Sequence, residues 1–413
     1  MDLARLAQKI TTTLFAAQSL GSAGFIAVAT VSSIVGARLS GNPALAGLPS
    51  AVYLLGSALA AMIASELMER LGRRGGLTLG LLIGVTGSGL AAASLFAGSF
   101  PLFLAGMATM GVGQAAVQLG RFAAAEVNPP EQRGRAISTV VFGGAVGAVL
   151  GPLLVGPTGR LAQRAGWDEL AGPFMVAMLL FIVAAVVIFT RLRPDPRELG
   201  REVARLYPAP NLAEGQRRSL TAIFRRPGPL LALSAMVFGQ VVMVMVMVIT
   251  SLHMQHNSHA LSSISLVISS HTFGMFAFSI ISGRLADRWG REPVILAGSV
   301  ILVLACLTAP LSPQVVPLAV ALFLLGLGWN LCYVGGSSLL ADHLLPAERA
   351  RAQGFNDLLI GLMSAAGSLS SGVVFATLGY GLMGAIGALL ALIPAGMTAW
   401  ALLARRRGLS GTD

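Results

Sequence analysis

The sequence GRLADRWGR at residues 283–291 separates two long apolar runs, and a sequence related to its second half, ERLGR, occurs at residues 69–73. A second pair of loops repeats in the same way, PEQRGRA at 130–136 and PAERARA at 346–352. The offset is 218 residues for the first pair and 216 for the second. Two pairs of matching loops at nearly one offset indicate that the chain consists of two homologous halves.

The amino-acid composition indicates which kind of segment lies between these loops. Of 413 residues, 55% are hydrophobic and only 11% are charged, whereas soluble domains average about 25% charged residues. A mean hydropathy of +0.78 excludes an ordinary soluble enzyme and favours an all-α polytopic membrane protein. At about 20–25 residues per crossing, the chain accommodates twelve transmembrane helices, six in each half. The apolar runs begin near Ile10, Pro43, Gly76, Pro101, Ala136, Ala171, Gly228, Leu261, Pro293, Pro313, Ala352 and Gly381.

The basic residues predict the orientation of these helices. With the N-terminus in the cytoplasm, 24 of the 28 basic residues fall in cytoplasmic segments, as the positive-inside rule requires. Both termini are then cytoplasmic. The stretch 191–226 contains nine Arg and is rich in Pro, so we expect one long loop there. The predicted domains are an N-terminal six-helix half at 1–190, a cytoplasmic central loop at 191–227 and a C-terminal six-helix half at 228–413.

The motif content excludes several function classes. The net charge of +11 does not indicate nucleic-acid binding, because the charges lie in short loops between apolar spans. The sequence contains no P-loop, no Gly-x-Ser-x-Gly elbow and no HExxH motif, so we expect neither enzyme activity nor a cofactor. Cys306 and Cys332 both fall inside apolar runs, so a structural disulfide is not expected.

Over its whole length the chain resembles the major facilitator superfamily (MFS) of transporters, whose signature loop is close to residues 283–291. The resemblance implies two six-helix repeats with a substrate site between them, in a protein that works as a monomer. It also implies gating by charged groups at cytoplasmic helix ends, which pair across the halves and separate when that side opens. The competing interpretation is that these charged residues only set the orientation of the helices in the membrane. The candidate gating residues are Glu69, Arg70, Arg73, Asp287, Arg288 and Arg291.

One ionisable residue lies deep in an apolar run, and such residues are functional candidates by default. This residue, His271, is followed four positions later by Met275, and Met243 and Met247 are four apart in the preceding run. Each pair therefore shares a helix face. Thioether and imidazole groups suit Cu(I) better than Mg²⁺ or Ca²⁺. The pattern predicts a metal-binding ladder across the membrane, although Met in such helices is most often packing material.

The turn between these two runs carries further candidate ligands. Four of the five His residues of the chain fall between positions 253 and 271. A cluster at the outer mouth could collect metal ions before they reach the ladder, whereas simple solvation of these side chains is the competing interpretation. The candidates for metal capture are His253, Met254, His256 and His259.

The Met and His pairs resemble the signature of the CcoA-like branch of MFS transporters, which is known for bacterial copper import across the cytoplasmic membrane. The resemblance implies that Met243, Met247, His271 and Met275 are copper ligands. Copper is then the transported substrate rather than a resident cofactor, and the protein lies in the bacterial inner membrane. The same branch holds relatives that take up riboflavin.

Polar residues in runs 1, 4, 7 and 10, which line the cavity in this superfamily, support a different interpretation. Amides there could bind an organic solute, or could join helices to one another. Three other functions therefore stay open: uptake of an organic solute such as riboflavin, proton-coupled efflux of drugs or metabolites, and metal sensing without transport. The candidate lining residues are Gln18, Gln114, Gln118, Gln240, Asn330 and Cys332.

Overall fold

The computed structural model describes residues 3–207 and 218–406, and gives their side chains except at 61–66, 69, 346–347, 349–350 and 405–406. Every regular element in these residues is helical. The helices of the first half, with a short 3₁₀ turn after α1 and another before α4, are α1 (Leu3–Ser40), α2 (Leu48–Ala97), α3 (Phe100–Glu126), α4 (Arg133–Arg164), α5 (Ala171–Arg191) and α6 (Pro196–Leu206). The remaining helices are α7 (Leu220–Phe224), α8 (Pro227–His256), α9 (Leu261–Phe276), α10 (Ser279–Trp289), α11 (Arg291–Thr308), α12 (Val315–Asp342) and α13 (Pro346–Arg406).

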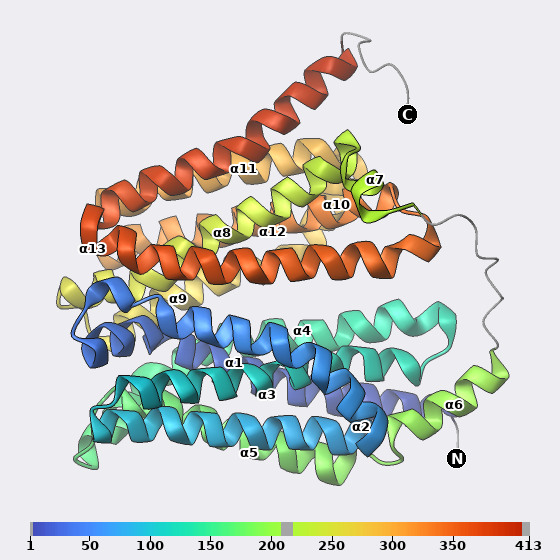
Figure 1. Cartoon of the computed structure of the whole chain (residues 1–413), viewed down its shortest axis with the longest axis horizontal. Coiled ribbons are helices and arrows are strands. Elements are labelled where there is room, and N and C mark those ends of the chain that lie inside the picture. Colours follow the sequence, from blue (N-terminus) through green and yellow to red (C-terminus); the bar gives the residue numbers. More distant parts are fainter. Residues whose placement is uncertain (1–2, 208–217, 407–413) are drawn as a thin grey trace. The chain divides into compact units, whose positions relative to one another are not determined.

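Contacts divide the chain into two compact units. The first comprises Met1–Asn211 with His259–Ser269, and the second comprises Leu212–Ser258 with Ser270–Asp413. Within the first unit the long helices α1 to α5 run side by side, and the short α6 lies at one end of them (Figure 1). Within the second unit α8 packs against α12 and α13, and α11 packs against α12.

Eleven helical segments of the described chain are long and apolar enough to cross a membrane. The last of them, Arg351–Ala404, has 54 residues, which at about 1.5 Å per residue is more than twice the roughly 30 Å of a hydrocarbon core. It also contains a break at Gly379, where φ is 76° and ψ is 176°. This segment is therefore long enough for two crossings, and a total of twelve remains a prediction.

The glycine of the repeated loop breaks the helix in the same way in both units. Gly72 interrupts α2 with φ 78° and ψ 167°, and Gly290 separates α10 from α11 with φ 94° and ψ 161°. This region of backbone space is essentially restricted to glycine, because a Cβ atom there meets the flanking peptide groups. The sequence repeat thus corresponds to a repeated backbone conformation.

The stretch 191–226, which we expected to be one long loop, contains α6 and α7. Asp195 explains the start of α6: its carboxylate accepts a hydrogen bond from the backbone N–H of Arg197 at 2.9 Å, and Pro196 occupies the first turn. Pro at this position and Asp at the N-cap both favour helix initiation. The sequence did not predict these helices, because a high Arg and Pro content concealed the apolar face of α6, on which Leu199 and Val203 are buried. That this stretch is the cytoplasmic connection between the halves stays a prediction.

The same carboxylate fixes α6 to the break in α2. Its Oδ1 and Oδ2 atoms accept hydrogen bonds from the backbone N–H groups of Arg73 and Arg74 at 3.1 and 3.0 Å. Asp195 therefore caps two helical segments at once, the one after Gly72 and α6 itself. An acidic side chain is favourable at both positions because the first turn of a helix exposes unpaired N–H groups.

Substitutions of these glycines provide a direct test of the repeated break. We expect Gly290→Ala to cost about 1–3 kcal/mol of stability, the usual cost of a residue forced into sparsely populated backbone space. Gly72→Ala should cost more, because its Cβ would lie 2.5 Å from Oδ2 of Asp195. The measurement is thermal unfolding of the purified variants in detergent.

Gly283→Ala is the matched control, since Gly283 lies in regular helix and a Cβ there meets nothing within 4 Å. Ala is a better helix former than Gly, so this variant should unfold at or above the wild-type temperature. Equal unfolding temperatures for Gly72→Ala and Gly283→Ala would contradict the account of the break.

Candidate functional site

A cluster of aromatic, amide and thioether side chains lies on α8, on α12 and on the last residues of α9, all within the second unit. The indole Nε1 of Trp329 donates a hydrogen bond to Oε1 of Gln240 at 2.7 Å. The Trp329 ring stacks on Tyr333 with centroids 5.0 Å apart and an interplanar angle of 19°. We call the following set the aromatic–methionine cluster: Gln240, Met243, Met247, Met275, Phe276, Trp329 and Tyr333.

This cluster lies at the middle of three apolar spans. Gln240, Met275 and Trp329 are each within two residues of the midpoints of Pro227–His256, Leu261–Trp289 and Val315–Asp342. All three side chains are half-buried. Polar groups at this depth in a membrane protein face the interior of the bundle or a water-filled cavity rather than lipid, and transporters hold substrates near the bilayer midplane.

The sequence predicted four ligands, and the structure brings three of them together. Met243 is buried, and Met247, Met275 and Trp329 pack against the same small hydrophobic group. The fourth, His271, is fully buried one helical turn from Met275. No three His, Cys, Asp or Glu side chains within the described residues are arranged to hold a metal ion, so any metal here would depend mainly on thioethers.

The imidazole of His271 is oriented by a single backbone contact. Its Nδ1 lies 3.0 Å from the carbonyl oxygen of Leu322. A carbonyl only accepts, so Nδ1 carries the proton and Nε2 presents a lone pair. Nε2 is buried and has no hydrogen-bond partner in the described structure. Such a group is costly to bury unpaired, and it can accept a hydrogen bond or bind a soft metal.

The expected metal-capture residues occupy different environments. His253 stacks on Tyr380 with centroids 4.1 Å apart, and the exposed His256 lies 5.7 Å from the ring of Phe375. Met254 is fully buried. His259 belongs to the first of the two units, whereas the other three residues belong to the second. Both His253 and His256 thus contact aromatic rings, and a role in metal capture stays a prediction.

Two of the expected lining residues join helices to one another. Nδ2 of Asn330 donates to the carbonyl of Met275 at 2.7 Å, and its Oδ1 accepts from the Ser282 hydroxyl at 2.5 Å. Asn330 thereby supplies hydrogen bonds at the interruption between α9 and α10. Cys332 is fully buried against α11, with its Sγ 3.6 Å from the Ser299 hydroxyl. The second unit contains three of the lining candidates, Gln240, Asn330 and Cys332. Of these, Gln240 belongs to the aromatic–methionine cluster.

The first unit contains the other three amides. Gln18 is buried and donates to the Ser22 hydroxyl at 3.4 Å. Gln114 and Gln118 are four apart on α3, where Gln118 is exposed and Oε1 of Gln114 is buried with no hydrogen-bond partner among the described residues. Arg121 lies one turn further along the same face. This row of polar groups offers hydrogen bonds that the fold itself does not use.

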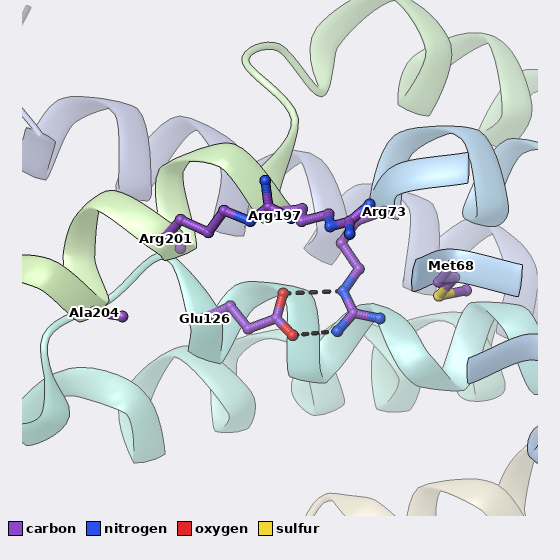
Figure 2. Close-up of a pocket in the computed structure, with 7 residues that line it drawn as sticks. Met68, Arg73, Glu126, Arg197, Arg201 and Ala204 are labelled. Carbon is purple, nitrogen blue, oxygen red and sulfur yellow. Dashed lines mark hydrogen bonds and ion pairs between the residues drawn. The ribbon is translucent and has the colours of Figure 1, made fainter. Parts of the chain in front are cut away.

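The gating candidates form ion pairs inside each unit. Both Nε and Nη2 of Arg73 donate to the carboxylate of Glu126, the last residue of α3, with Nε 2.9 Å from Oε2 (Figure 2). In the second unit, Nε of Arg291 lies 3.0 Å from Oδ2 of Asp342, the last residue of α12. Arg291 also contacts Asp287 at 3.0 Å. Arg70 and Arg288 are exposed, and the side chain of Glu69 lies outside the described residues.

A further ion pair fixes the second repeated loop. The carboxylate of Glu348, which is 1% exposed, accepts four hydrogen bonds, three from Arg218 and one from the backbone of Leu345. The side-chain hydrogen bond from Arg218 is the main reason that the pKa of Glu348 falls from 4.5 to about 2. Charge-assisted hydrogen bonds to a buried carboxylate stabilise its ionised form.

Sequence reasoning missed Trp329, Tyr333 and the ion-pair partners Glu126 and Asp342. A signal existed for the first of these, since Trp329 is one of only four Trp residues and stands in the middle of an apolar run. A buried indole N–H needs an acceptor, which indicates a polar neighbour. Glu126 and Asp342 differ in position by 216 residues, the offset of the second pair of loops.

The eleven long apolar helical segments of the described chain define a multi-pass membrane protein. A family model of the Major Facilitator Superfamily matches residues 13–262 and 232–412, and the chain belongs to this superfamily. Its members are transporters, so this protein is not an enzyme and works without a cofactor, in agreement with the motif content.

Individual relatives give more detail. The chain is 37% identical over 389 residues to the uncharacterized MFS-type transporter YdeG of Bacillus subtilis, covering 93% of this chain and 89% of that protein. It is 34% identical over 360 residues to the riboflavin transporter RfnT of Brucella anthropi, covering 87% of each. The solved structure of the nucleoside transporter NupG matches with a TM-score of 0.70 at 14% identity, over 95% of this chain and 98% of that one. The last likeness concerns the fold alone, and none of these three proteins supports the expected copper-importing branch.

The buried carboxylate of Glu348 provides a pH-dependent test of the second repeated loop. Because its pKa is lowered in the folded protein, its contribution to stability is complete above about pH 4.5 and is lost as the pH falls toward 2. We expect Glu348→Gln to lower stability at pH 7 by on the order of 3 kcal/mol, since it leaves Arg218 without its charged partner. The measurement is the unfolding temperature of both proteins between pH 7 and pH 3.

The expected result is that the two unfolding temperatures converge as the pH falls. Asp287→Asn is the matched control, because Asp287 is exposed and its ion pair with Arg291 is worth little. A difference between wild type and Glu348→Gln that stays constant down to pH 3 would contradict the assignment.

Proposed function

We propose that this chain takes up a flat, conjugated organic solute across the bacterial cytoplasmic membrane by alternating access, with riboflavin as the first candidate. In this proposal the chain works as a monomer, with twelve spans and both termini in the cytoplasm. The positive-inside distribution of Arg supports the orientation. The bacterial origin of the relatives YdeG and RfnT supports the location.

The observation that carries the proposal is the stacked pair of Trp329 and Tyr333 at mid-span. Flat rings stack on aromatic side chains with an attraction of about 0.5–1.5 kcal/mol beyond the apolar area they bury. Gln240 holds the indole in place through its 2.7 Å hydrogen bond. The relative RfnT, whose name describes a riboflavin transporter, supports the choice of a conjugated ring system as the ligand.

The thioethers of the cluster suit the same ligand. Met side chains adapt to irregular shapes and make favourable contacts between sulfur and aromatic rings, so Met243, Met247 and Met275 can pack around a flat ring. The free Nε2 of His271 can accept a hydrogen bond from a ring N–H of the solute after a small rearrangement of its surroundings. The cluster thus offers stacking and soft packing, and His271, one helical turn from Met275, would add one directional contact.

Copper import is the second candidate, and one observation favours it. Three thioethers converge in the hydrophobic group that contains Met243, and His271 retains an unpaired ring nitrogen nearby in sequence. Thioether and imidazole groups together suit Cu(I). The two functions differ in what they need, because stacking depends on Trp329 and metal binding depends on sulfur.

Removing the indole separates these candidates. We expect Trp329→Leu to raise the KM for riboflavin uptake by about fivefold to tenfold, the loss of one stacking contact. The measurement is uptake of radiolabelled riboflavin by a bacterium that lacks its own riboflavin transport and synthesis, with protein amounts checked. Trp400→Leu is the matched control, because Trp400 is 68% exposed on α13 and should leave KM unchanged.

The double variant Met243→Leu with Met247→Leu completes the comparison. Leu preserves side-chain volume and removes sulfur, so riboflavin uptake should change by less than about threefold. Saturable copper uptake that disappears in this variant, together with no riboflavin uptake by the wild type, would overturn the proposal in favour of copper.

A further inference from the structure

A small basic pocket lies where α6 meets the break in α2 at Gly72 and the end of α3. Its volume is about 210 Å³, and it is lined by Met68, Arg73, Glu126, Arg197, Gly200, Arg201 and Ala204. Figure 2 shows the side chains of Arg197 and Arg201 reaching from α6 beside the Arg73–Glu126 ion pair. The pocket is smaller than the roughly 300–1,000 Å³ of sites that hold drug-sized ligands, so it suits a small group.

The charges in this pocket do not cancel. Arg73 and Glu126 form a two-pronged ion pair and neutralise each other. Arg197 and Arg201 have no ion pair within the part of the chain that the structure describes. Two guanidinium groups four residues apart on one helix face therefore present uncompensated donors, and planar guanidinium groups match the oxygens of a phosphate.

From the end of the apolar span α5, we infer that the pocket lies near a membrane surface. The apolar span α5 ends at Arg191, and α6 begins five positions later at Pro196, so the two helix ends are at most about 18 Å apart. α6 is strongly amphipathic: its buried Leu199 and Val203 face the bundle, and Leu206 at its end is 58% exposed. A helix of this kind, basic on one side and close to the end of a span, is positioned beside lipid headgroups.

We propose that the pocket formed by Arg73, Arg197 and Arg201 binds a phosphate-bearing anion, namely the headgroup of an anionic membrane lipid. The Arg197 and Arg201 guanidinium groups bind the phosphate oxygens. Glu126 sets the strength of binding, because its carboxylate occupies Arg73 and repels a second anion. The proposal concerns the first unit alone and is independent of which solute the protein transports.

Lipid binding to the full-length chain tests this directly. The purified protein, stripped of lipid in detergent, is titrated with phosphatidylglycerol, phosphatidylcholine or inorganic phosphate and followed by native mass spectrometry. We expect each Arg that contacts the headgroup to contribute about fivefold in affinity for anionic lipid. We therefore expect the double variant Arg197→Ala with Arg201→Ala to bind phosphatidylglycerol more weakly by about 20-fold, and phosphatidylcholine to bind weakly to both proteins.

Arg205→Ala is the matched control, because Arg205 lies on the same helix and does not line the pocket. Its affinity for phosphatidylglycerol should stay within about twofold of wild type, given the local nature of headgroup contacts. Glu126→Gln should bind phosphatidylglycerol more tightly, by about fivefold, which a poorly folded variant cannot do.

Three outcomes would overturn the proposal. Equal binding of phosphatidylglycerol and phosphatidylcholine would remove the anionic requirement. Equal weakening by Arg205→Ala and by the double variant would reduce the site to general surface charge. Displacement of the lipid by millimolar inorganic phosphate would identify free phosphate, rather than a lipid headgroup, as the ligand.

Discussion

The structure depends on an arginine that directly follows a helix-breaking glycine and binds the acidic residue at the end of a neighbouring long helix. In the first unit Arg73 follows Gly72 and binds Glu126. In the second, Arg291 follows Gly290 and binds Asp342. The glycine provides the sharp change of direction between two apolar helices, and the ion pair fixes the end of a third helix beside it. The repeated loop motif is thus a repeated structural joint, and topology alone does not account for its charges.

The apolar spans contain few polar side chains, and these few are the basis for the proposed site. Each polar side chain inside a span must find a partner or meet water. Asn330 and Cys332 find partners within the bundle. The half-buried side chains of Gln240 and Trp329 form a hydrogen bond with each other at mid-span. One ring nitrogen of His271 has no hydrogen-bond partner among the described residues. The polar groups that remain half-buried or unpaired at this depth are the ones expected to meet a substrate.

Much of the fold follows from the sequence because its signals are local and repeated. Apolar runs predict helices, and the paired loops predict two halves related by a nearly constant offset. The helix α6 was missed because its buried face consists of just three residues, Pro196, Leu199 and Val203, within a stretch dominated by Arg. The roles of Asn330 and Cys332 could not be predicted from their positions in the sequence, because packing decides which face of α12 meets α10 or α11.

The Met residues were predicted as a group, and the structure does bring Met243, Met247 and Met275 into one cluster. Their partner Trp329 gives that cluster its aromatic character, and sequence spacing alone did not identify it.

Binding of a flat conjugated solute to the aromatic–methionine cluster is tested most directly at equilibrium, without the complications of transport. Purified protein in detergent is titrated into riboflavin, and quenching of flavin fluorescence is recorded for the wild type and for Trp329→Leu. Stacking of the flavin ring on the indole predicts saturable quenching by the wild type and a much weaker, right-shifted response from the variant. No quenching by a folded wild-type protein, or quenching that is identical in Trp329→Leu, would contradict the claim.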